Sequence, residues 1–140
     1  MPQKFTWDEN LDVGIESINL QHRHFIEIAN RLLDMTDKES IGKDELEAVI
    51  EDLEKYAFYH LETEENYFEK YGYDGALPHI AAHDQYRDSV KKLVEKVDDP
   101  ETDVKALAQE CAIFSAKWLI KHIQVMDKQY ATFFQEKGIK

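Results

Sequence analysis

The sequence has one cysteine and few of the residues that interrupt helices. Cys111 has no second cysteine with which to form an intrachain disulfide, and this fits a reducing compartment. Only three prolines and five glycines occur in 140 residues, so long stretches of chain lack a turn signal. No repeat, low-complexity tract or linker divides the sequence. We therefore predict a single domain over residues 1–140.

Two further absences limit the partners and the location. Basic residues number 17 against 29 acidic ones, and the net charge of −12 disfavours nucleic acid and anionic membrane surfaces as partners. No apolar stretch approaches the roughly 20 residues that cross a bilayer. The N-terminal residues also lack the basic and then apolar pattern of a secretory signal. We expect a cytoplasmic protein with no nucleic-acid or membrane partner.

What the sequence does contain is apolar residues at steps of three and four, the spacing of one helix face. Turn signals divide this pattern into four segments joined by short loops. The pattern predicts an all-α fold, an antiparallel up-down-up-down four-helix bundle with residues 1–17 as an N-terminal arm packed across it. The predicted helices cover residues 18–37, 44–71, 78–97 and 102–134.

Five of the six histidines fall on the predicted apolar faces, and all four helices contribute. A lone histidine in a core is usually a hydrogen-bonded structural residue. Five together would need more polar partners than these apolar faces supply, so a metal site is favoured. The sixth histidine, His24, lies about 200° from His22 around the helix and is expected to be exposed. The five inward histidines are His22, His60, His79, His83 and His122.

The stretch HLETEE is predicted to contain one carboxylate that points inward. At about 100° per residue, Glu64 lies about 40° from His60, one turn along the helix. Glu62, Glu65 and Glu69 fall roughly 140–200° away, so we expect them on the solvent face. A buried carboxylate is costly unless it is compensated, and a cation beside the inward imidazoles would compensate it.

Donor types alone do not choose the metal. Imidazole nitrogens with carboxylate oxygens suit iron, zinc, copper or manganese. The segment HIAAH, residues 79–83, could by itself hold zinc, but a single zinc takes about four ligands and this chain offers more. Two metal ions are therefore the economical solution. No Glu-x-x-His pair occurs, which separates the pattern from ferritin-like di-iron proteins.

Four segments, in their order and spacing, resemble the hemerythrin family, in particular its single-domain bacterial members, the bacteriohemerythrins. The resemblance covers nearly the whole chain and implies the four-helix fold. The segments are WDENLDVGIESINLQH (7–22), HLETEE (60–65), HIAAH (79–83) and WLIKHIQVMD (118–127).

The resemblance also implies a centre of two irons bridged by an oxo or hydroxo group. One iron would take three histidines and the other two, with a glutamate and an aspartate bridging both ions. The implied ligands are His79, His83 and His122 on the first iron, His22 and His60 on the second, and Glu64 and Asp127 as bridges.

Two residues depart from a simple form of this picture. Asp127 follows His122 by five residues, which on an ideal helix turns it about 140° off the ligand face, where Met126 would fit better. A wide turn or π-bulge would reconcile the two. Asn19 stands where related sequences commonly carry aspartate. Because Asn19 is outside the implied ligand set, we expect an adjustment around the site and not its loss.

Reversible dioxygen binding, for oxygen transport, storage or delivery, is the function that the resemblance implies. With six-coordinate irons, the implied ligands and a bridging hydroxide leave one position open, on the iron with two histidines. Leu119 lies one turn before His122. With Phe25 and Ile26 it is expected to form an apolar wall of the dioxygen pocket. No additional acid, base or substrate-sized polar pocket is evident, so we do not expect an enzyme.

Two alternatives stay open at this point. A di-iron redox enzyme could reduce peroxide or nitric oxide or oxidise ferrous iron, and steady turnover with a reductant would identify it. An oxygen sensor could instead signal through a partner protein. The sequence does not name an oxygen-accepting enzyme or a redox partner, and we expect a monomer.

Overall fold

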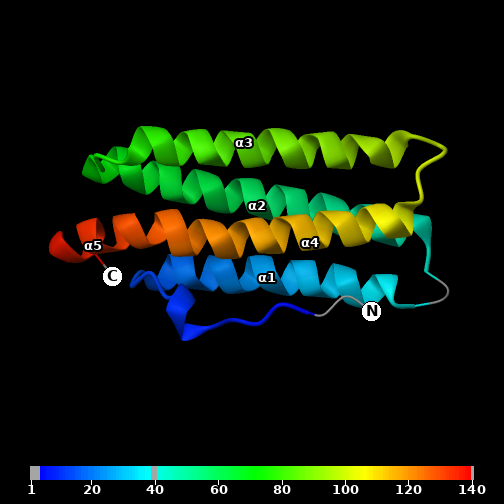
Figure 1. Cartoon of the computed structure of the whole chain (residues 1–140), viewed down its shortest axis with the longest axis horizontal. Helices are drawn as coiled ribbons and strands as arrows, with labels where there is room; N and C mark the ends of the chain where they lie inside the picture. The colour runs from blue at the N-terminus through cyan, green and yellow to red at the C-terminus, as the bar shows by residue number, and fades with distance from the viewer. Residues whose placement is uncertain (1–3, 39–40, 140) are drawn as a thin grey trace.

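Four long helices lie side by side along the molecule (Figure 1). The computed structural model describes residues 4–38 and 41–139 of the chain. Successive helices run in opposite directions, α1 packs on α2 and α4, and α3 packs on the same two helices. The predicted all-α four-helix bundle is therefore confirmed. The helices are α1 (Glu16–Thr36), α2 (Lys43–Tyr71), α3 (Ala76–Glu95) and α4 (Val104–His122).

The last helix does not end at His122. It continues through a π-helical segment, η3 (Ile123–Asp127), into α5 (Lys128–Glu136). The sequence pattern placed one helix over 102–134, whereas the structure has three consecutive segments over that range. The first three helices begin one or two residues before their predicted starts, and two short 3-10 turns complete the described elements, namely η1 (Glu9–Leu11) and η2 (Lys96–Asp98).

The turn between α2 and α3 has a specific local cause. Gly72 adopts the left-handed conformation, with φ 65° and ψ 45°, and its N–H donates to the carbonyl of Phe68. Glycine reaches this conformation without a steric penalty, which is why helices often end on it. The turn sends α3 back along α2 within a few residues. The histidines of α3 are thereby brought beside Glu64 of α2.

One apolar core fills the space between the helices. It contains side chains from every long helix, from α5 and from the N-terminal arm, for example Leu11, Ile18, Leu53, Val90 and Phe134, all nearly inaccessible to solvent. In the described part of the chain, no helix is long and apolar enough to cross a membrane.

The N-terminal arm runs along α1 up to Ile15 (Figure 1). The N–H of Phe5 donates to Asn30 Oδ1 at 2.8 Å, and Asn30 Nδ2 donates back to the carbonyl of Phe5 at 2.7 Å. Further along, Val13 and Ile15 are buried in the core. Residues 1–3 of the predicted arm lie outside the described residues, and residues 16–17 belong to α1.

Asn19 fastens the end of this arm. Its Oδ1 accepts from the N–H of Val13 at 3.0 Å, and its Nδ2 donates to Asp12 Oδ1 at 2.8 Å. Asp12 also accepts from the N–H of Gly14 at 2.7 Å. These hydrogen bonds hold the pKa of Asp12 below its usual value, the Gly14 bond contributing most and the Asn19 bond next. An amide serves here because one side chain must both accept and donate.

Replacing Asn19 with aspartate should therefore destabilise the arm. The new carboxylate would lose the donated hydrogen bond and face Asp12 at close range, at a cost of about 1–3 kcal/mol in the free energy of unfolding. Denaturant unfolding of Asn19→Asp against the natural chain measures this. The double variant Asn19→Asp/Asp12→Asn removes the repulsion and should recover part of the loss. Equal stability of all three proteins would contradict this role.

Candidate metal centre

Seven donor side chains gather in the interior of the bundle. They project from α1, α2, α3, α4 and η3, so every long element contributes. Each is at most 5% exposed. They are the seven residues that the sequence analysis selected, namely His22, His60, Glu64, His79, His83, His122 and Asp127.

One donor group contains three histidines and Glu64. His122 Nε2 lies 2.9 Å from His79 Nε2 and 3.1 Å from His83 Nε2. Glu64 Oε1 lies 3.1 Å from His83 Nε2. The four donor atoms fall within 4.8 Å of one another, as ligands of a single ion do.

The other donor group contains two histidines and two carboxylates. His22 Nε2 lies 3.2 Å from Asp127 Oδ2 and 3.8 Å from Glu64 Oε2. His60 Nε2 lies 3.8 Å from Glu64 Oε1. These four donors also fall within 4.8 Å of one another. The two groups thus hold three and two histidines.

The carboxylates stand between the two groups. Asp127 turns Oδ2 toward His22, whereas its Oδ1 lies 3.0 Å from His79 Nε2 and 3.1 Å from His122 Nε2. Glu64 is a member of both groups. Each carboxylate can therefore offer one oxygen to either side, which is the arrangement that two neighbouring metal ions require.

The π-helical segment places Asp127 in this site. A π-helix closes its hydrogen bonds over five residues, so a residue five positions after His122 returns to the same face. The π-bulge that the sequence analysis required is present. Met126, which the ideal periodicity favoured, is partly exposed and lines a surface hollow with Trp118 and Val125. The Trp118 ring stacks on the His122 imidazole, with centroids 4.4 Å apart.

The donor set fits metal ions on the chemistry of its own atoms. Of the buried side-chain polar atoms in the described residues that lack a hydrogen-bond partner, all but the indole nitrogen of Trp7 belong to the seven donors. Such atoms are costly unless they meet a partner. The Nε2 atoms of His79, His83 and His122 face one another, and lone pairs at this distance repel unless a proton or cation lies between them. Ions bound between the two groups would satisfy these atoms together.

Without metal, the carboxylates set the charge of the histidines beside them. Burial alone would lower the pKa of His22, but hydrogen bonds to Asp127 and Glu64 raise it to about 9. The same opposition raises the pKa of His79 to about 9. In His60 burial dominates and lowers the pKa to about 3. The metal-free site therefore binds protons where the loaded site would bind metal.

Two ligand candidates are oriented through their other ring nitrogen. His60 Nδ1 lies 2.8 Å from Gln21 Oε1, and His83 Nδ1 lies 2.8 Å from Glu65 Oε2. Because these oxygens can only accept, both Nδ1 atoms donate, and the Nε2 lone pairs are left for a metal. Arg87 holds the Glu65 carboxylate with two hydrogen bonds, at 2.8 and 2.9 Å.

Glu65 is a correction to the sequence analysis, which placed it on the solvent face. Its side chain is 20% exposed and reaches α3, whereas Glu62 and Glu69 are exposed as predicted. The helical angle was informative about direction, but it could not reveal that α3 packs close enough for His83 and Arg87 to approach from the side.

Tyr130 on α5 is a residue of the site that the sequence analysis missed. Its hydroxyl donates to Glu64 Oε2, and the side chain is fully buried. Burial and the charges of Asp127 and Glu64 raise the pKa of Tyr130 well above its usual value, so it stays a donor. Its position one turn after Asp127 was the feature of the sequence that could have indicated a place in the site. Only the π-helical segment makes that turn face the site.

The three residues expected to form a pocket wall are all buried. Phe25 and Leu119 are fully inaccessible, and Ile26 is nearly so. The Phe25 ring lies 6.4 Å from the His60 ring, on the side of the two-histidine group. Leu119 lies one turn before His122 on α4. All three residues are thus part of the apolar core.

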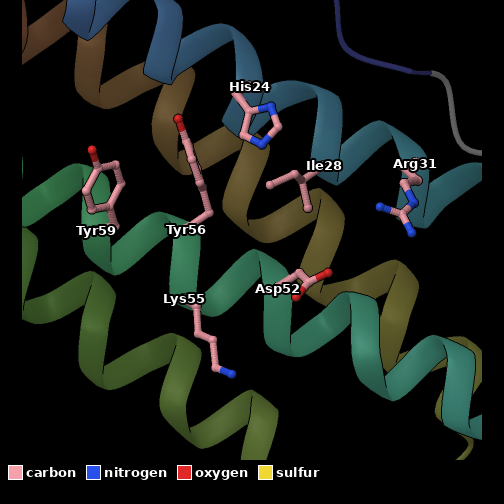
Figure 2. Close-up of a pocket in the computed structure, with 7 residues that line it drawn as sticks. All are labelled: His24, Ile28, Arg31, Asp52, Lys55, Tyr56 and Tyr59. Atoms are coloured by element: carbon pink, nitrogen blue, oxygen red, sulfur yellow. The ribbon is translucent and has the colours of Figure 1, made fainter.

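His24 takes no part in the centre. It is exposed, as predicted, and lines an open hollow between α1 and α2 (Figure 2). Its ring packs edge-on against Tyr56 with centroids 4.5 Å apart. None of the seven donors lines this hollow, whose other residues are Ile28, Arg31, Asp52, Lys55 and Tyr59.

The fold and the site define a class of protein, an all-helical bundle with a buried histidine–carboxylate centre that can hold metal ions. The chain belongs to the hemerythrin family, since the family model described as "Hemerythrin HHE cation binding domain" matches residues 13–134. The resemblance seen in the sequence is thereby confirmed.

Individual relatives agree with this assignment. A bacteriohemerythrin of Clostridium acetobutylicum is 30% identical over 90% of this chain and 98% of its own length. A myohemerythrin of Sipunculus nudus is 26% identical over 93% of both chains. A solved structure of wild-type hemerythrin superposes with a TM-score of 0.81 at 26% identity, covering 91% of this chain and 95% of that one.

Metal removal should reverse the way stability depends on pH. In the metal-free protein, His22 and His79 have pKa values near 9, above the unfolded value of 6.5, so the folded state binds protons that the unfolded chain releases. Stability from these groups is fully present below pH 6.5 and is lost as the pH rises through 9. Metal binding instead strengthens with pH because its ligands must be deprotonated.

Denaturant unfolding from pH 6.5 to 9, with chelator and with metal, measures both slopes. The metal-loaded protein should also be more stable at every pH, by about 4 kcal/mol per site at a metal concentration 1,000-fold above Kd. The exposed histidine offers a control, since His24→Gln should leave both slopes unchanged. Parallel curves for the two forms would contradict a site in the core.

Proposed function

We propose that this protein binds dioxygen reversibly at a non-haem di-iron centre, for oxygen transport, storage or delivery. The observation that carries the proposal is the pair of donor groups joined by Glu64 and Asp127, with three histidines on one side and two on the other. Membership of the hemerythrin family supports iron as the metal. In this role the protein is a carrier and not an enzyme.

Each side chain has a role in the proposed centre. Three histidines would hold one iron and two would hold the other, with the carboxylates shared and an oxo or hydroxo group between the ions. Two ferrous ions, when bound, supply the two electrons that reversible dioxygen binding requires. The proposed ligands are His79, His83 and His122 on one side, His22 and His60 on the other, and Glu64 and Asp127 between them.

The unequal numbers of histidines favour dioxygen at the two-histidine side, where the protein itself supplies fewer donors. Phe25 borders that side, and we assign Leu119 and Ile26 to the same wall. An apolar wall would admit dioxygen and keep out water and anions, which would otherwise favour its loss as hydrogen peroxide together with two electrons from the irons. The hydroxyl of Tyr130 keeps the Glu64 carboxylate in place. Together these residues favour release of dioxygen over its reduction.

Iron content and an optical spectrum test the function directly. We expect two irons per chain and a new absorption band when the reduced protein meets air, a band that disappears when dioxygen is removed. One metal per chain, or mostly zinc after iron-replete expression, would contradict the di-iron centre. Steady dioxygen or peroxide consumption with a reductant would identify a redox enzyme instead. Elution as a single 16.5 kDa species would support a monomer.

Leu119→Ala tests the placement of the pocket. Truncation should widen the apolar wall, speed autoxidation to the diferric form and quicken azide access, while iron content stays at two because no donor is removed. Leucine-to-alanine changes in a core also cost about 2–5 kcal/mol of stability. Leu107→Ala, at a buried position in the same helix about four turns from His122, is the matched control. Equal autoxidation and azide rates in both variants would place the pocket elsewhere.

A further inference from the structure

The two donor groups differ in the charge of the residue that accepts a hydrogen bond from a histidine Nδ1. His83, in the three-histidine group, donates its Nδ1 hydrogen to the anionic Glu65, whereas His60, in the two-histidine group, donates to the neutral Gln21. We propose that Glu65, balanced by Arg87, strengthens His83 as a donor and sets the reduction potential of the three-histidine metal, while Gln21 leaves the other metal untuned. This inference rests on the proposed di-iron function.

Glu65 is built into its position. One carboxylate oxygen, Oε2, accepts both from His83 Nδ1 and from Arg87 Nη1, each at 2.8 Å, and the other accepts from Arg87 Nη2 at 2.9 Å. Arg87 Nη1 also donates to Asp84 at 3.0 Å. The side chains of Glu65 and Arg87 are 20% and 21% exposed. A charge pair held this firmly, and largely shielded from water, acts on its neighbour with little screening.

Glu65 and Arg87 should shift the midpoint potential of the metal in opposite directions. A carboxylate that accepts from an imidazole N–H draws the proton toward itself, so the opposite nitrogen becomes a stronger donor and stabilises the higher oxidation state of its metal. Arg87 pulls electron density from the same carboxylate and opposes this effect. Removing Glu65 should raise the midpoint potential, and removing Arg87 should lower it.

Opposite signs separate tuning from simple positioning. If Glu65 and Arg87 only held the ring of His83 in place, loss of either would loosen the same ligand and shift the centre in the same direction. Gln21 provides the converse test on the other group. Its Nε2 donates weakly to Thr63 at 3.4 Å, so a carboxylate there would lose little and would add a charge behind His60.

Redox titration of the iron-loaded protein compares Glu65→Gln, Arg87→Gln and Gln21→Glu with the natural chain. We expect a higher midpoint potential for Glu65→Gln and lower ones for the other two. Glu62→Gln, an exposed residue on the same helix with the same change of charge, is the control and should shift the potential far less. Chelator competition with zinc is a readout that needs neither iron nor dioxygen. Glu65→Gln should weaken zinc binding about 10- to 100-fold, and Glu62→Gln should not.

Shifts of the same sign in Glu65→Gln and Arg87→Gln would overturn the inference, as would a shift in Glu62→Gln equal to that in Glu65→Gln. Unchanged zinc affinity in Glu65→Gln would also overturn it. The proposed function fails in a different way. The variants Glu65→Gln and Arg87→Gln could shift the potential in opposite directions while the natural protein shows no reversible dioxygen band. In that case Glu65 still tunes the metal, and only the dioxygen role is lost.

Discussion

Two carboxylates buried among five imidazoles are the interaction on which the rest of the structure depends. Moving ionised carboxylates out of water costs several kcal/mol each, and the apolar core around them returns none of it. Glu64 accepts one hydrogen bond from Tyr130. The two carboxylate oxygens of Asp127 have no hydrogen-bond partner among the described residues and face the histidines. Protons or metal ions between the donors would compensate the buried charges, so we expect occupancy of the centre and folding to be coupled.

Local backbone structure serves this centre at two points. The left-handed Gly72 lets α3 return along α2 so that His79 and His83 approach Glu64, and η3 rotates Asp127 onto the face of His122. A π-helical turn is rare, and it occurs frequently at functional sites. Here it also turns Tyr130 inward, so one irregular turn supplies both a carboxylate and the hydroxyl that holds the second carboxylate.

The hydrogen-bond partners that orient the histidines are neutral in one donor group and charged in the other. One histidine of each group is fixed by an oxygen from a neighbouring helix, an amide oxygen for His60 and a carboxylate oxygen for His83. Neither partner lies on the helix of the histidine it orients, so the packing of α1 on α2 and of α2 on α3 fixes the rings. Donor orientation is thus a property of helix packing and not of any single helix.

The sequence by itself determined the helical fold and the inward direction of the five histidines and Glu64, because a period of 3.6 fixes direction within each regular helix regardless of its neighbours. Periodicity favoured Met126, and it was the family resemblance that selected Asp127 and with it the need for an irregular turn. What the tertiary structure alone decided is contact between helices. Glu65 contacts His83 and Arg87, and Tyr130 contacts Glu64, because side chains at the edge of one helix reach side chains of the helix packed against it. Angular position along one helix carries no information about how closely that next helix approaches.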